Sequence, residues 1–132
     1  HRRPVIIHNL KASAAIVGAV RTTRFSQGGI VHAFSGSLEE AQAFIRCGFK
    51  IGIGSLLLNP AAKKARQAAA ALPLEHIVLE TDSPFMLKNE INTPANVRAI
   101  AETAAGLRGI SLAALSVQTE INVAQLLAFQ TA

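Results

Sequence analysis

The chain has 132 residues, half of them hydrophobic, and a formal net charge of +5 at pH 7. This length and apolar content suit one globular domain with a buried core and exclude a disordered chain. The basic excess mildly favours an anionic partner such as nucleic acid. We expect no membrane span and no secretory leader, and the single cysteine, Cys47, excludes an internal disulfide framework, so the expected location is the cytoplasm.

Four short apolar runs, each followed by a helical pattern, predict four strand–helix units in chain order. The strands are expected at residues 4–8, 29–33, 49–53 and 76–81, and the helices at about 11–22, 37–48, 59–72, 93–107 and 111–129. Ser37 with Glu40 fits a capping box. Asn59-Pro60 and Thr93-Pro94 each fit a helix start with proline at the first helical position.

Continuous apolar strands that alternate with helices are typical of an α/β protein with a parallel sheet covered by helices. At this point an open doubly wound sheet and a barrel both fit. The sequence contains neither a glycine-rich dinucleotide loop nor a Walker phosphate loop. Residues 1–132 are expected to form a single domain.

Three metal-capable side chains stand at equivalent places along the chain, where predicted strands end. His8 ends the first strand, His32 lies near the end of the second, and Asp82 follows the fourth. Parallel strands share one carboxyl edge, so the three side chains are expected to converge there as ligands of Mg²⁺, Mn²⁺ or Zn²⁺. A metal-activated water would then perform hydrolysis, with Asp82 as ligand and proton acceptor. Glu80 would lie behind a histidine and orient it.

Simpler roles also fit these residues one at a time. A histidine at a strand end is commonly a hydrogen-bonded structural residue, and an aspartate before Ser-Pro commonly only starts a turn. The basic cluster of Lys63, Lys64 and Arg66 fits a solvated helix face. The residues alone therefore leave a metal site and a structural role both open.

Five stretches form a set that covers most of the chain: PVIIH at residues 4–8, VHAFSGS at 31–37, GFKIGIG at 48–54, LPL at 72–74 and LETDSP at 79–84. Together they resemble the TatD family of metal-dependent deoxyribonucleases. The resemblance implies a TIM barrel of the amidohydrolase type, with one or two metal ions at its top, that hydrolyses phosphodiester bonds of DNA. His8, His32 and Asp82 match family residues that contact the metals or the bound phosphate.

The same resemblance implies that part of a barrel is missing. A family barrel opens with a strand ending in His-x-His and has a glutamate on its fourth strand, and neither precedes His1. A TIM barrel takes about 250 residues, so the chain resembles strands five to eight with their helices. We expect a truncated product or a piece of a longer hydrolase, completed by an N-terminal half or by a homodimer. An inactive remnant or assembly module, and an amidohydrolase of small amides or esters, are the competing expectations.

The family's phosphate contacts are only partly present. Asn9 and Leu10 stand where the family has serine and arginine, Ile91-Asn92-Thr93-Pro94 replaces an arginine-containing stretch, and Gln125 stands at another arginine position. Cations are therefore lost near the presumed phosphate site. Ser35, Gly36 and Ser37 open a helix and could offer backbone N–H groups to a phosphate, although they also fit a helix cap alone.

Overall fold

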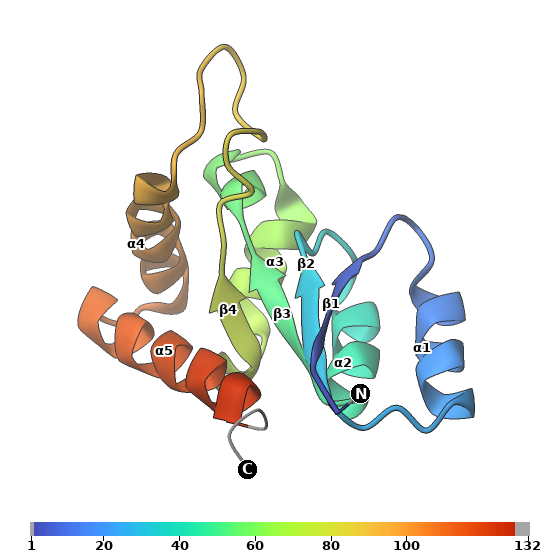
Figure 1. Cartoon of the computed structure of the whole chain (residues 1–132). Helices are drawn as coiled ribbons and strands as arrows, with labels where there is room; N and C mark the ends of the chain where they lie inside the picture. Colours follow the sequence, from blue (N-terminus) through green and yellow to red (C-terminus); the bar gives the residue numbers. More distant parts are fainter. Residues whose placement is uncertain (1, 129–132) are drawn as a thin grey trace.

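The computed structural model describes residues 2–128 and shows the expected alternation of strands and helices (Figure 1). The strands are β1 (Val5–His8), β2 (Gly29–His32), β3 (Phe49–Ile53) and β4 (Ile77–Leu79). The helices are α1 (Ser13–Thr22), α2 (Leu38–Arg46), α3 (Lys63–Ala71), α4 (Val97–Arg108) and α5 (Leu112–Ala128). Three 3₁₀ turns, η1 (Ser55–Leu58), η2 (Leu74–His76) and η3 (Pro94–Asn96), complete the chain's regular structure within this range.

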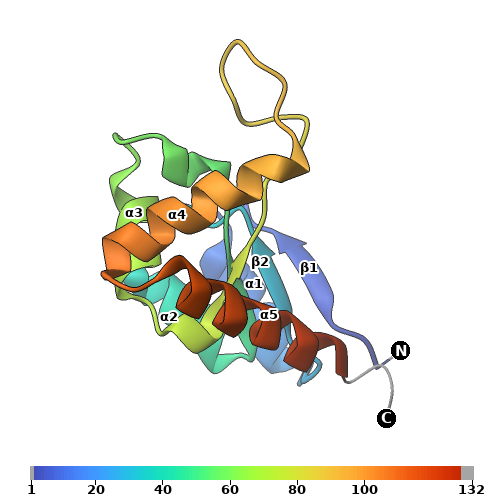
Figure 2. The ribbon, with the colours of Figure 1, turned by 90° about the vertical axis from the view of Figure 1, so that its left-hand side faces the viewer.

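The strands form one parallel sheet in the order β1-β2-β3-β4, as the alternation predicted. In this register His8 on β1 is the neighbour of His32 on β2. α2 packs against β3, and α4 and α5 pack against β4, which Figure 2 shows from the side of those two helices. The segment between β4 and α4 rises above the carboxyl ends of the strands in both views. The sheet therefore presents one carboxyl edge beneath a long loop.

The core lies between the sheet and its helices. Its fully buried side chains include Val31, Phe44, Phe49, Ile51, Leu57, Ile77, Ile100 and Leu115. On β1 the pattern differs, because Ile7 packs against this core whereas Ile6 is 74% exposed. Neighbouring side chains in a strand point to opposite faces, so Ile6 belongs to the face of the sheet turned away from these helices.

Local contacts confirm two predicted helix caps. The Ser37 hydroxyl accepts the backbone N–H of Glu40 at 3.2 Å, ahead of α2. The Glu40 carboxylate, which a capping box would direct to the backbone N–H of Ser37, instead accepts the hydroxyl of Ser13 at 2.6 Å and ties the start of α1 to α2. Ser111 accepts the backbone N–H of Ala114 at 3.1 Å and caps α5. The predicted end of this last helix, Phe129, lies outside the described residues.

Two other predicted helix starts were wrong by a few residues. The side chain of Asn59 accepts the backbone N–H of Ala61 at 3.0 Å, so Asn59 closes a tight local turn and α3 begins only at Lys63. Thr93 makes no side-chain cap, and Pro94 opens the 3₁₀ turn η3 before α4. In both places the proline stands in a turn that leads into the helix.

Among residues 2–128, no single helix is long and apolar enough to cross a membrane. The segments Pro94–Arg108 and Leu112–Ala128 satisfy the length and composition together, but they meet at an angle of 110°.

Candidate functional site

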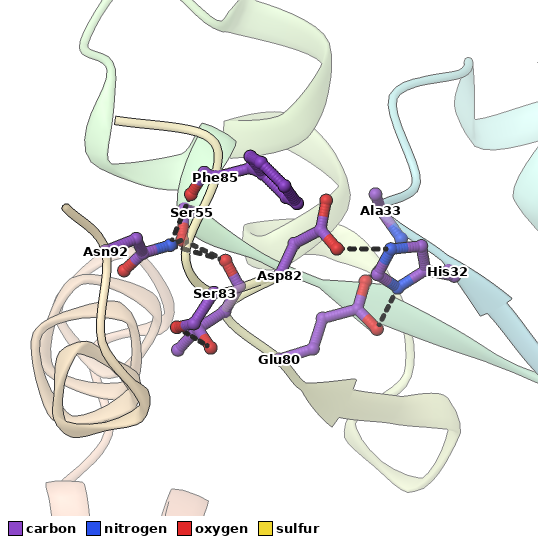
Figure 3. A network of polar contacts seen from close by, with 9 residues as sticks. His32, Ala33, Ser55, Glu80, Asp82, Ser83, Phe85 and Asn92 are labelled. Atoms are coloured by element: carbon purple, nitrogen blue, oxygen red, sulfur yellow. Dashed lines mark hydrogen bonds and ion pairs between the residues drawn. The ribbon is translucent and has the colours of Figure 1, made fainter. Parts of the chain in front are cut away.

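A histidine held between two carboxylates lies at the carboxyl edge of the sheet (Figure 3). His32 ends β2, whereas Glu80 and Asp82 follow β4. Nδ1 of His32 lies 2.8 Å from Oε2 of Glu80, and Nε2 lies 3.3 Å from Oδ1 of Asp82. Each ring nitrogen therefore faces a different carboxylate, and the structure brings together three of the predicted site residues.

Glu80 reaches His32 by crossing the strand between them. β3 separates β2 from β4, and Gly52 on β3 has no side chain at this point. A Cβ at Gly52 would lie 2.7 Å from Oε1 of Glu80, so only glycine leaves the carboxylate its place. Glu80 also accepts the backbone N–H of Ala33, whose φ of 48° is in the left-handed region. One carboxylate thus fixes both the His32 ring and the turn that follows it.

The two carboxylates set the protonation of His32. Burial lowers the pKa of the ring, but the hydrogen bond and charge of Glu80 and the charge of Asp82 outweigh it, so the pKa is raised above 6.5. When the ring is neutral, a proton on Nδ1 donated to Glu80 leaves the Nε2 lone pair on the side of Asp82. That tautomer is the one in which a histidine binds a metal through Nε2.

A buried asparagine holds the loop that carries Asp82. Asn92 is 2% exposed, and its Nδ2 lies 3.0 Å from Oγ of Ser55, 2.6 Å from the carbonyl oxygen of Thr81 and 2.8 Å from that of Phe85. These hydrogen bonds fix the backbone on both sides of Asp82. Asp82 itself has a φ of 59° and a side chain that is 38% exposed. Asn92 therefore positions Asp82. Sequence reasoning missed this role, since it noted residues 91–94 for a missing arginine and gave Asn92 no task.

His8 lies beside this group without completing it. The centres of the His8 and His32 rings are 5.6 Å apart, and the His8 side chain is exposed. Within residues 2–128, no group of three or more His, Cys, Asp or Glu side chains is arranged to hold a metal ion. The donor chemistry of His32 and Asp82 fits a divalent cation, but the predicted set of three ligands is not closed by these residues alone.

The predicted phosphate loop divides into two parts. Ser35 and Gly36 line a cavity of about 510 Å³ that His32 also borders. Ser37 instead caps α2 through its hydroxyl. The same cavity is lined by Lys64, which sequence reasoning placed on a solvated helix face.

Comparisons with known proteins show which family the chain resembles. Residues 1–128 match the family model described as TatD related DNase. An uncharacterized metal-dependent hydrolase of Haemophilus influenzae is 46% identical over 83 residues, which make up 63% of this chain and 32% of that protein. A 3'-5' ssDNA/RNA exonuclease TatD of Erwinia billingiae is 32% identical over 108 residues, covering 75% of this chain and 41% of that protein.

A solved structure extends the likeness to the fold. The crystal structure of YJJV, a TatD homolog from Escherichia coli K12, matches with a TM-score of 0.87 and 30% identity, over 93% of this chain and 49% of that one. The chain thus spans between a third and a half of the length of these relatives. The family model covers the strands, the His32 site and the long loop alike. The resemblance seen in the sequence is confirmed, and the chain belongs to the TatD related DNase family.

Proposed function

We propose that the chain supplies part of the active site of a cytoplasmic, metal-dependent hydrolase that cleaves phosphodiester bonds of DNA. The observation that carries this proposal is the His32 ring held between Glu80 and Asp82 at the carboxyl edge of a parallel sheet. The names of the relatives support it, since one is a metal-dependent hydrolase and another a 3'-5' ssDNA/RNA exonuclease.

Each residue of the site has a defined task in this proposal. A bound Mg²⁺, Mn²⁺ or Zn²⁺ supplies an activated water and stabilises negative charge on the phosphate. His32 through Nε2 and Asp82 through its carboxylate would hold the ion, with His8 alongside. Glu80 keeps the proton of His32 on Nδ1. Asp82 is partly open to solvent and would accept the proton that the attacking water releases.

The two outer strands of the sheet in the described residues support a second half as the source of the remaining ligands. β1 and β4 are the outer strands, and Ile6 on β1 is 74% exposed. Beside β4 a groove of about 660 Å³ is lined largely by apolar side chains, among them Leu79, Val97, Ala101, Leu112, Val123 and Leu127. Because the chain matches only 49% of the solved homolog, we assign these surfaces to the other half of a TIM barrel, which also brings the missing ligands.

Complementation tests the proposal. The chain is mixed with the half of the Escherichia coli homolog that it does not match, and Mn²⁺ binding and cleavage of labelled single-stranded DNA are measured. We expect turnover with both halves present and its loss in His32→Ala. A folded, assembled pair that binds no Mn²⁺ would contradict the proposal and favour an inactive remnant. Cleavage of a neutral ester but not of DNA would favour a small-molecule hydrolase. An active dimer of this chain alone would show that a second copy, and not the other half of a barrel, supplies the missing ligands.

A further inference from the structure

The cavity beside His32 carries two lysines that the proposed reaction does not use. It has a volume of about 510 Å³ and lies where α1 and α2 begin and where α3 makes its first turn. Its polar lining consists of Asn9, Lys11, Ser13, His32, Ser35, Gly36, Glu40 and Lys64. Since His32 forms part of the wall, a group that occupies this cavity lies next to the candidate reaction centre.

We infer that Lys11 and Lys64 bind a second phosphate of a nucleic-acid strand, next to the phosphodiester at His32. This inference rests on the proposed function and names the substrate class more narrowly, as a strand with at least two phosphates. The cavity volume falls in the range of pockets that hold whole small-molecule ligands, about 300 to 1,000 Å³. It therefore offers room for more than one isolated phosphate group.

The charges around the cavity favour an anion. Lys11 and Lys64 are both exposed, so their ammonium groups stay hydrated and mobile enough to follow a flexible strand. Glu40 is the one carboxylate among the described residues that line the cavity, and its Oε2 accepts the hydroxyl of Ser13 at 2.6 Å. Two cations therefore face one carboxylate that already has a hydrogen-bond partner, and the cavity keeps a net positive charge.

The turn that carries Lys11 is held in place by local hydrogen bonds. Nδ2 of Asn9 donates to Oγ of Ser13 at 2.8 Å, and Oδ1 of Asn9 accepts the backbone N–H of Ala12 at 3.0 Å. Lys11 stands inside this short turn with a φ of 53°. The turn fixes the backbone from which the Lys11 side chain extends, so the lysine is presented to the cavity and not carried on a free loop.

The test measures binding without turnover. Fluorescence anisotropy follows a labelled trithymidylate in the presence of EDTA, with inorganic tripolyphosphate as a second probe. Lys11→Gln and Lys64→Gln are each expected to weaken trithymidylate binding about fivefold and to reduce the salt slope by about 0.7. Lys63→Gln is the matched control, because Lys63 is exposed and adjacent on α3 but does not line the cavity. Its expected change is below about twofold.

The outcomes separate this inference from the proposed function. Equal losses in Lys63→Gln and Lys64→Gln would overturn the inference, because a general basic field would then explain binding. Trithymidylate affinity that is unchanged in Lys11→Gln and Lys64→Gln would overturn the subsite. It would not contradict the proposed DNA hydrolase. Tripolyphosphate binding that needs both lysines, with no trithymidylate binding, would overturn the inference, because the anion site would then not take a nucleic-acid strand. Far-UV circular dichroism shows that each variant is folded.

Discussion

Gly52 lies directly under the carboxylate of Glu80, and a Cβ in its place would stand 2.7 Å from Oε1. The atom that must give way is at the end of a flexible side chain, so Gly52→Ala is expected to move Glu80 and leave the fold intact. His32 then loses its Nδ1 partner, and metal affinity in the complete barrel falls about tenfold. NMR of the ring nitrogens reports the change of tautomer.

Gly54→Ala is the matched control for this prediction. A Cβ at Gly54 would meet Cγ of Glu80 at 3.4 Å, an ordinary contact, so the ring signals of His32 should not change. If Gly52→Ala also left those signals unchanged, the contact of Glu80 with His32 would not depend on the absence of a side chain at Gly52.

The metal-free chain should show a pH dependence that belongs to His32. Its pKa in the folded state is raised above 6.5, so the folded state holds the proton more tightly than the unfolded state. The contribution of protonated His32 to the free energy of unfolding is complete at pH values below the pKa of the unfolded state. It is lost as the pH rises through the pKa of the folded state. Urea unfolding in EDTA, at about pH 5.5 and about pH 8.5, measures it as the difference between wild type and His32→Gln.

That difference in unfolding free energy should shrink toward the higher pH. The subtraction removes the titration of groups that the two proteins share. A difference that stayed constant with pH, or grew, would show that Glu80 and Asp82 do not stabilise a protonated His32.

Removal of the Asn92 side chain should loosen the loop around Asp82. Asn92→Ala leaves the carbonyl groups of Thr81 and Phe85 without this donor, which costs about 1–3 kcal/mol in the free energy of unfolding. Hydrogen exchange in the segment from residue 80 to 92 should rise, as measured by mass spectrometry. Asn96→Ala removes a single hydrogen bond to Asn92, at 2.8 Å, and should cost less. Unchanged hydrogen exchange in Asn92→Ala would show that Asn92 does not hold the loop around Asp82.

Asp82 should matter for chemistry more than for folding. Its side chain is 38% exposed, so Asp82→Asn is expected to unfold at a similar urea concentration to wild type. In the complete barrel it should lose about 100-fold or more in turnover of DNA. Glu90→Gln, an exposed carboxylate in the same loop, is the control and should keep full turnover. An active, folded Asp82→Asn would refute the role assigned to this residue.

Barrel closure predicts that a charge at Ile6 blocks assembly. Ile6 is 74% exposed in the chain, so Ile6→Asp should leave its own fold unchanged and prevent binding of the complementary half. Light scattering after size-exclusion chromatography measures the complex. Val117→Asp, at a residue 59% exposed and outside the groove beside β4, should assemble normally. Equal assembly of both variants would rule out the face that carries Ile6 as the interface.

The convergence of His32 and Asp82 could be predicted because it follows from simple geometry. Strand alternation and a shared carboxyl edge place the last side chains of parallel strands together, whatever the details of packing. The histidine–carboxylate contacts at 2.8 Å and 3.3 Å are the outcome. His8 followed the same rule as far as its position next to His32, 5.6 Å between ring centres.

The remaining features depend on contacts that the sequence pattern does not encode. The place of Gly52 under Glu80 follows from β3 lying between β2 and β4. Asn92 finds Ser55 across the fold, 37 positions apart. Asn59 was misread because its side chain bonds the backbone two residues on, which competes with helix capping. Lys64, in the first turn of α3, lines the cavity.

The core described above is closed within this chain, with Val31, Ile51, Leu57 and Ile77 all at 0–1% exposure. Its interior therefore needs nothing from the proposed partner, which has to fit the two strand edges, the groove and the sheet face that carries Ile6. In the proposed barrel, a half with its own interior can therefore be joined to a different partner half as a unit. Chimeras that join this chain to first halves of different relatives should thus succeed or fail on edge complementarity, with no redesign of the packing inside.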